Sequence, residues 1–174
     1  MPPDLDTARL RLRPLRLDDL EFCVAMNMDP DVGRYLFPHG PPMAAEQRDN
    51  WRRKITGGWP QPGAIWAVEW AGVEMMLGWC ALFFLEESGL IEIGYRYATA
   101  AWGQGVATEA AAQVLDHGFR ELAFDPIVAV THPENLGSQQ VLKKIGLRPG
   151  GLQFHYGLDL SFFSLGRDDY LTSR

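Results

Sequence analysis

Cysteine and long apolar runs are both scarce in this sequence. Cys23 and Cys80 are its only cysteines, and they lie far apart in apolar surroundings, which favours a pair of reduced core thiols over a disulfide. The longest apolar runs are far below the roughly 20 residues that a membrane span needs. The N-terminus carries charged residues but not the apolar stretch of a signal peptide. We therefore predict a cytoplasmic protein with no membrane partner.

A metal-binding pattern is also missing. The chain contains four histidines, none of them at the spacing of a ligand set, and no pair of cysteines accompanies them. They are His39, His117, His132 and His155. We expect a protein that needs no metal.

Basic residues are fewer than acidic ones: 16 Lys and Arg against 22 Asp and Glu give a formal net charge of −6. No basic stripe interleaved with aromatic residues is present, which argues against nucleic acid as the main partner. The negative charge mildly favours a cationic small-molecule partner. The length of 174 residues suits a single domain, 1–174, and no repeat, low-complexity tract or linker divides it.

A glycine-rich turn at residues 101–109 separates a predicted strand from a predicted helix. Residues 90–97 are rich in β-branched and aromatic side chains, which favours a strand. After Gly105, apolar residues recur at helical spacing up to about residue 119. Gly103 and Gly105 lack Cβ atoms, and the first N–H groups of a helix have no partner within it. This combination predicts an anion site, best suited to a phosphate or pyrophosphate.

Other interpretations of this turn are possible. It could be a tight connection that binds nothing. A dinucleotide-binding fingerprint would need a third small residue where Thr108 stands and an acid ending the next strand, whereas Asp125 precedes that strand. A P-loop would need Gly-Lys-Ser/Thr, which does not occur.

The whole chain reads as an alternation of strands and helices. We predict strands at residues 7–14, 64–70, 75–85, 90–97, 127–130, 152–156 and 158–165. We predict helices over about ten residues after Asp18, which would serve as N-cap, and at 44–55, 105–119 and 135–145, with residues 32–43 forming a loop. Short turns make the strands between 64 and 97 antiparallel neighbours, and the helical crossover makes strand 127–130 parallel to 90–97. Asn135 is the predicted N-cap of the last helix and Gly146 its C-terminal glycine.

Several motifs together resemble one family. The glycine-rich segment, Trp-Gly-Gln-Gly-Val-Ala-Thr-Glu-Ala, is similar to the acyl-CoA loop of the GNAT superfamily of N-acetyltransferases, with Trp102 in place of the usual Arg or Gln. The form of this loop resembles the branch that contains the ribosomal-protein N-terminal acetyltransferases. Residues 7–14, 93–95, 135–146 and 164–170 are also similar to segments of that branch, the last to its C-terminal strand. The resemblance runs nearly the whole length.

The resemblance implies the fold and the cosubstrate. The fold would be α/β (α+β), with a mixed, mostly antiparallel sheet of about seven strands and about four helices, splayed between the fourth and fifth strands. The cosubstrate would be acetyl-CoA, and the enzyme would transfer its acetyl group directly to an amine. We expect Trp102 to pack beneath the loop. The residues that would bind the cofactor are Tyr95, Arg96, Tyr97, Trp102, Gly103, Gln104, Gly105, Val106, Ala107, Thr108, Asn135, Ser138 and Lys144.

Two residues are candidates for the chemistry. Period-two alternation places Glu92 on the strand face opposite Ile91 and Ile93, and many relatives carry an acid at this position, so Glu92 is the preferred base. The alternative for Glu92 is an ion pair or hydrogen bond in a wet part of the sheet. Many relatives use a tyrosine as the proton donor where this chain has Leu142. In the ribosomal-protein branch the donor is a serine that corresponds to Ser138, which could instead serve only to bond the main chain at a helix start.

The acceptor would enter from the opposite mouth of the splayed strands. The family resemblance assigns that mouth to aromatic residues of two segments, which could instead merely cover the core: Tyr35, Phe37, His39, Phe154 and Tyr156. The acceptor would be a protein N-terminal α-amine or a small amine, and the enzyme a monomer or homodimer. The alternative function is an acyl-CoA-binding module of the same fold that has lost catalysis.

Overall fold

The computed structural model describes residues 1–37, 40, 42–57 and 63–173. Eight strands form one sheet in the order β1-β2-β3-β4-β5-β6-β8-β7. All neighbours are antiparallel except β5 and β6, which are parallel as predicted. The strands are β1 (Leu5–Asp6), β2 (Leu10–Pro14), β3 (Ala64–Trp70), β4 (Met76–Phe84), β5 (Ile91–Tyr97), β6 (Ile127–Thr131), β7 (Arg148–His155) and β8 (Leu158–Leu165).

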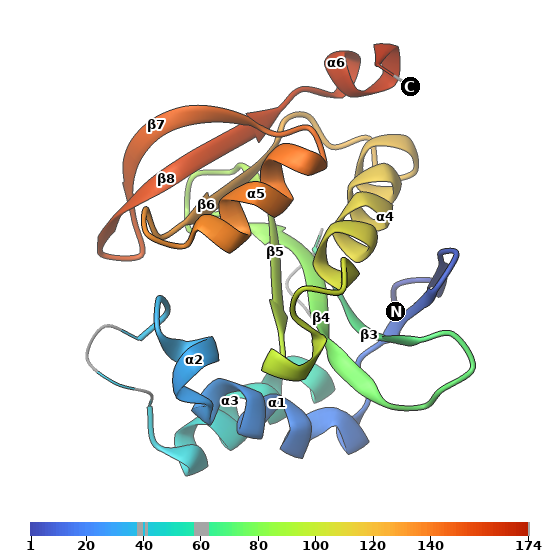
Figure 1. Cartoon of the computed structure of the whole chain (residues 1–174), viewed down its shortest axis with the longest axis vertical. Helices are drawn as coiled ribbons and strands as arrows, with labels where there is room; N and C mark the ends of the chain where they lie inside the picture. The colour runs from blue at the N-terminus through green and yellow to red at the C-terminus, as the bar shows by residue number, and fades with distance from the viewer. Residues whose placement is uncertain (38–39, 41, 58–62, 174) are drawn as a thin grey trace.

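Helices cover both faces of this sheet (Figure 1). One face packs against α4 and α5, and the other against α1 and α3. The helices are α1 (Leu20–Met28), α2 (Pro30–Gly33), α3 (Ala44–Thr56), α4 (Val106–Arg120), α5 (Leu136–Lys144) and α6 (Arg167–Thr172), with 3-10 turns at Leu17–Asp19 and Thr99–Ala101. No helix within the described ranges is both long and apolar enough to span a bilayer.

The two faces explain why the central strands are almost wholly apolar. On β3, Trp66 and Val68 enter the core beneath α4, whereas Ile65 and Ala67 enter the core beneath α1 and α3. Successive side chains of a strand point to opposite faces, so a strand covered on both sides needs apolar residues at every position. Cys23 and Cys80 are free thiols buried in these two cores, as predicted.

Three short elements were not predicted. The two-residue strand β1 has no hydrophobic period to detect. Helix α2 begins where the prediction ended a helix, because Asp29 and Pro30 stop α1 and at once start α2, with Asp29 Oδ1 accepting the Asp31 N–H at 2.9 Å. Helix α6 lies where the family resemblance, through residues 164–170, implied the C-terminal strand, whereas the strand predicted at 158–165 is present as β8. Strand β8 ends at Leu165, and Asp168 and Asp169 in the first turn of α6 favour a helix start.

The capping predictions were correct for α5 and wrong for α1. Asn135 accepts the Ser138 N–H at 3.1 Å, and Gly146 adopts a positive φ of 102° after the helix. Asp18 is exposed and caps nothing. The adjacent Asp19 instead accepts the Arg16 N–H at 2.7 Å and forms a buried ion pair with Arg13, so the pairing partner selects the second aspartate.

The sheet splays apart between β5 and β6, the fourth and fifth of the predicted strands. Their pairing is limited to Ile91 with Ile127 and Glu92 with Val128. From residue 93 onward the β5 main chain has no ladder partner on this side within the described part of the chain. The expected gap is therefore present, and Glu92 lies at the point where it opens.

Candidate active site

The glycine-rich loop places an uncapped helix start beside a cavity of about 740 Å³. Gly103 and Gly105 have φ values of 73° and 79°, a region that favours glycine. No side chain caps the first turn of α4, so its N–H groups remain available to a ligand. A Cβ on Gly103 would stand in open space, whereas one on Gly105 would lie 3.2 Å from the Arg9 side chain, so the loop is open to a ligand at Gly103. Main-chain donors and a helix dipole of this kind fit a pyrophosphate.

Most of the residues predicted to bind the cofactor line this cavity. They are Tyr95, Arg96, Tyr97, Trp102, Gly103, Gly105, Val106, Ala107, Thr108, Asn135, Ser138 and Lys144. Gln104 does not, because its side chain turns back to donate to the Ala100 carbonyl at 2.6 Å. Trp102 does not pack beneath the loop as expected. Its side chain is half exposed, with Nε1 donating to the Tyr97 carbonyl at 2.9 Å.

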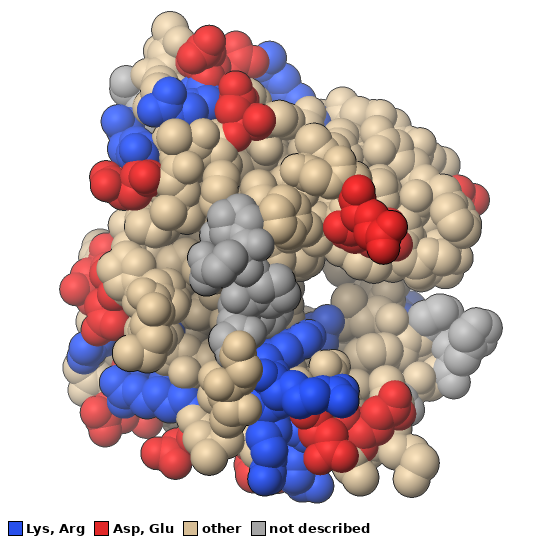
Figure 2. Space-filling view, turned by 180° about the vertical axis from the view of Figure 1, so that it is seen from behind, with Lys and Arg blue, Asp and Glu red and all other residues tan. Residues whose placement is uncertain are grey.

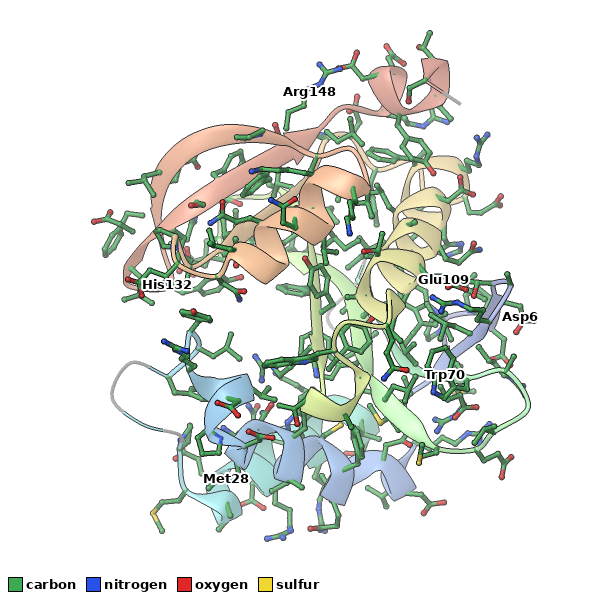
Figure 3. The ribbon with its side chains drawn as sticks, in the orientation of Figure 1. Asp6, Met28, Trp70, Glu109, His132 and Arg148 are labelled. Atoms are coloured by element: carbon green, nitrogen blue, oxygen red, sulfur yellow. The ribbon has the colours of Figure 1, made fainter. Side chains whose placement is uncertain are left out.

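The helix start is also fixed from the side of the N-terminal strands. Glu109 points from α4 toward them (Figure 3), where it accepts hydrogen bonds from the Arg9 side chain at 2.7 Å and from Thr7 at 2.6 Å. Arg9 in turn donates to the Gln104 carbonyl at 3.1 Å. These contacts hold the loop conformation without using the N–H groups of α4.

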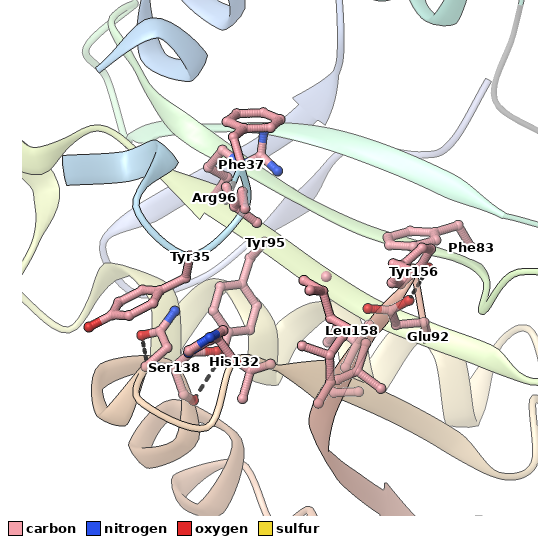
Figure 4. Close-up of a pocket in the computed structure, with 18 of the residues that line it drawn as sticks. Tyr35, Phe37, Phe83, Glu92, Tyr95, Arg96, His132, Ser138, Tyr156 and Leu158 are labelled. Carbon is pink, nitrogen blue, oxygen red and sulfur yellow. Dashed lines mark hydrogen bonds between the residues drawn. The ribbon is translucent and has the colours of Figure 1, made fainter. Parts of the chain in front are cut away.

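A second cavity, of about 970 Å³, lies on the other side of β5 (Figure 4). Its lining includes Glu92 and the helices α1 and α3. The two cavities share five lining residues, so they meet at the splayed strands: Tyr35, Tyr95, Arg96, Asn135 and Ser138. A donor in the first cavity and an acceptor in the second would come together at this junction.

Glu92 is a buried carboxylate at the start of the gap, with only 5% of its surface exposed. The hydroxyl of Tyr156, from the turn between β7 and β8, donates to its Oε2 at 2.6 Å (Figure 4). Burial raises the pKa of Glu92 to about 7, and hydrogen bonds from Tyr156 and from the Val130 main chain only partly oppose this. The carboxyl group can therefore both take and release a proton near neutral pH.

The β7–β8 hairpin is attached to the turn after β4 by Glu86. Its carboxylate accepts the Tyr156 N–H at 3.0 Å and lies 2.9 Å from His155 Nδ1. The His155 hydrogen bond, followed by that from the Tyr156 main chain, lowers the pKa of Glu86. Tyr156 itself has a positive φ of 52°, which the Glu86 contact stabilises. Glu86 thus holds the Tyr156 hydroxyl over Glu92.

Ser138 lies in the first turn of α5 at the junction of the cavities. Its N–H donates to Asn135, and its Oγ lies 3.1 Å from the Tyr95 hydroxyl. The Tyr95 hydroxyl also lies 3.1 Å from the Ser138 carbonyl. When it donates to this carbonyl, the serine O–H donates to the Tyr95 oxygen; when it donates to Ser138 Oγ instead, the serine O–H is free to donate to a ligand. Leu142, at the position of the family's tyrosine, is fully buried and carries no donor.

The predicted acceptor residues are only partly brought together. Tyr35 stacks on His132 across the cavity mouth, with ring centroids 5.1 Å apart, and Phe37 covers Arg96. Tyr156 also lines the cavity, but Phe154 is 71% exposed and lines neither cavity, because alternation along β7 turns it outward. His39 lies outside the described residues.

Other cavity residues were not singled out from the sequence. Glu86, Asn27, Gln47, Lys54 and Trp79 all line the larger cavity. The sequence pattern placed Asn27 at the end of a helix and gave Gln47 and Lys54 no role. The one available signal was a polar residue at a buried position of an amphipathic helix, as at Asn27 and Gln47. No group of three or more His, Cys, Asp or Glu able to hold a metal occurs among the residues that the structure describes.

The splayed sheet, the uncapped glycine-rich helix start and the cavity beside it fit the binding of an acyl-CoA, as in acyl-CoA-dependent acyltransferases. Residues 9–148 match the family model of the GNAT acetyltransferase domain, and the chain belongs to this family of N-acetyltransferases. It is 33% identical over 147 residues to the uncharacterized protein YkkB of Bacillus subtilis, covering 82% of this chain and 84% of that protein.

Solved structures show the same fold. A GNAT acetyltransferase from Bacillus anthracis has a TM-score of 0.80 at 24% identity, covering 95% of this chain and 99% of that chain. A spermidine N-acetyltransferase from Vibrio cholerae, in complex with CoA and spermine, has a TM-score of 0.77 at 21% identity, covering 95% of this chain and 99% of that chain.

Proposed function

We propose that this N-acetyltransferase transfers the acetyl group of acetyl-CoA directly to a primary amine, with Glu92 as the base and Ser138 as the proton donor. The observation that carries the proposal is the position of Glu92. It is a buried carboxylate with a pKa of about 7, which lines the larger cavity at the point where the gap between β5 and β6 opens. Bound acetyl-CoA would supply the acetyl group.

The first task of the site is to free the amine's lone pair. At pH 7, deprotonating an α-amine of pKa about 8 costs about 1.4 kcal/mol, and a lysine amine of pKa about 10.4 costs about 4.6 kcal/mol. A carboxylate with a pKa near 7 suits the first better than the second, because its basicity is close to that of the α-amine. This supports an α-amine or another amine of modest basicity.

The second task is to hold the cosubstrate and protonate its thiolate. The N–H groups at the start of α4 and Lys144 would bind the pyrophosphate, and the free edge of β5 would bind the pantetheine. Ser138 Oγ–H would then donate to the thiolate while its Oγ accepts the Tyr95 O–H. A thiol of pKa near 8.5 is a modest leaving group, so this donor contributes less than the base.

Two kinds of acceptor amine are candidates. The motif resemblance favours a protein N-terminal α-amine of the ribosomal-protein branch, whereas the spermidine N-acetyltransferase relative favours a small amine. Tyr35, Phe37 and Tyr156 would line the path of either.

The experiment is a set of primary amines incubated with acetyl-CoA, with release of free thiol measured and the acetylated product identified by mass. We expect thiol release that depends on the amine, a large loss in Glu92→Gln and a smaller loss in Ser138→Ala. The alternative, an acyl-CoA-binding module, is favoured by the absence of a hydroxyl at Leu142. Tight CoA binding without thiol release for any amine would establish that alternative and overturn the proposal.

A further inference from the structure

The larger cavity is charged in opposite ways at its two ends. Its acidic lining residues among those described, Glu86 and Glu92, lie at the hairpin end. Its cations, Arg96 and Lys54, lie beside α1 and α3, and Arg96 also lines the smaller cavity where the two cavities meet. Figure 4 shows Arg96 beneath Phe37. Glu92 lies further back along β5, next to Tyr156 from the β7–β8 turn. Figure 2 shows Lys and Arg side chains along the lower rim of a hollow, with acidic residues on the lobe above.

Arg96 is the notable member of this set because its charge has no carboxylate partner. Within the described part of the chain it forms no ion pair, and its hydrogen-bond partner is the neutral Asn27 Oδ1. Its guanidinium also lies 5.3 Å from the Trp79 ring centroid and 5.9 Å from that of Phe37. These ring contacts consume no N–H donor, so most of the five guanidinium N–H groups remain available to a ligand.

The surroundings of Arg96 are fixed rather than incidental. Asn27 and Gln47 are both buried, and Asn27 Nδ2 donates to Gln47 Oε1 at 2.8 Å. This bond turns the Asn27 oxygen toward Arg96, so the guanidinium is oriented by a neutral acceptor. A purely structural arginine in this position would be neutralised by an acid, as Arg13 is by Asp19 and Glu69 in the same protein.

Arg96 is partly buried, so its charge is partly removed from water. Desolvation lowers the pKa of Arg96 to about 10, so it stays charged at neutral pH without an anion to stabilise it. Burial, followed by the nearby charge of Arg96, also lowers the pKa of Lys54, which lies over the Trp51 ring. An arriving anion would relieve the desolvation of Arg96.

We propose that the acceptor is an amine that also carries a carboxylate several bonds away, with the amine directed to Glu92 and the carboxylate bound by Arg96. The inference rests on the proposed function of the same site and names its substrate class. The Glu92 and Arg96 Cα atoms are about 13 Å apart at the usual strand rise, too far for the amine and carboxylate of one amino acid. Two or three peptide residues, at about 3.3–3.6 Å each, span the distance left between the two side chains. A polyamine offers nothing to Arg96.

The carboxylate could be the C-terminus of a short peptide or the side chain near a protein's N-terminus. Matched acceptors separate these sources. Ala-Ala-Ala is compared with its C-terminal amide, and Ala-Ala-Glu amide with Ala-Ala-Gln amide. In at least one of the two pairs, we expect kcat/KM for acetyl transfer to be at least about tenfold higher for the peptide with the carboxylate than for its neutral counterpart. The pair that shows this difference identifies the source of the carboxylate.

Two variants assign this preference to Arg96. Arg96→Met removes the donors, and Asn27→Asp supplies a carboxylate of the same shape that neutralises the arginine, with Gln47 able to rotate its amide to pair with it. Each should reduce the acid-to-amide ratio to about one. Arg53→Met, on the exposed face of α3, is the matched control and should keep the wild-type ratio.

The same acids and amides are also titrated calorimetrically in the presence of CoA, which reads binding without chemistry. If the enzyme acetylates amines but kcat/KM is equal for the acid and the amide of each pair, the acid site is overturned and the proposed chemistry stands. The same holds if the acid-to-amide ratio of kcat/KM is unchanged in both variants. Absence of transfer to any amine, with preferential binding of the acids that Arg96→Met and Asn27→Asp abolish, would overturn the chemistry and support the acid site.

Discussion

Glu92 is the residue on which the proposed chemistry depends most. It is the one carboxylate of β5, a strand covered on both faces, and it accepts a hydrogen bond from the Tyr156 hydroxyl. Burial raises its pKa to about 7. Alternation along residues 90–97 identified its face correctly. The Tyr156 contact could not be foreseen, because it joins residues 64 positions apart through a hairpin whose placement depends on Glu86.

The raised pKa has a consequence for stability. In the unfolded chain Glu92 titrates near its ordinary value of 4.5, whereas in the folded protein it titrates near 7. As the pH rises between these values the unfolded state loses its proton first, so the free energy of unfolding falls, and the loss is complete above about pH 7. Glu92→Gln removes this cost. We expect the variant to be more stable than the wild type at pH 8, by about 1–3 kcal/mol.

Urea denaturation at pH 4.5 and pH 8 measures this difference. The gain from the substitution should shrink toward pH 4.5, where Glu92 is protonated in the folded wild type and half protonated in the unfolded chain. A wild type as stable as the variant at pH 8, or a difference independent of pH, would show that Glu92 is not destabilised by its burial.

Among the elements, the start of α4 is the one that the sequence described best. Glycine positions, helical period and the strand before them are local signals, and all lie within about 30 residues. The elements that were missed, β1, α2 and α6, are each six residues or fewer, so no period could reveal them. Trp102 was misplaced because its hydrogen bond to Tyr97 depends on how the loop returns to its own strand.

The loop yields a prediction for cosubstrate binding. Gly103→Glu places a negative side chain in the cavity where the pyrophosphate would lie, and charge repulsion should weaken CoA binding at least about tenfold by calorimetry. Gly72→Glu is the matched control, because Gly72 also has a positive φ, 78°, and open space around it, but lies in the β3–β4 turn. Equal affinity in the two variants would remove the loop from the binding site.

At the scale of the whole molecule, two cavities meet where the sheet splays between β5 and β6. Their order along β5 follows from the family topology and was predicted from the sequence. The distribution of charge was not. A net charge of −6 favoured a cationic acceptor, but the described lining of the larger cavity carries cations at one end, since Arg96 and Lys54 are brought together from different elements. Composition counts charges and cannot locate them.

The central claim is that Glu92 accepts the proton of the amine in the cavity opposite the α4 loop. The most direct test is the pH dependence of kcat/KM for a primary amine in the wild type and in Glu92→Gln, with CoA affinity checked by calorimetry. We predict that the wild-type rate rises with pH through about 7, as Glu92 loses its proton, and continues to rise toward the pKa of the amine. Glu92→Gln should lack the first rise and be slower by about 10²-fold at neutral pH, with the deficit shrinking at high pH where the amine is already neutral. Identical pH profiles in the two proteins would contradict the account.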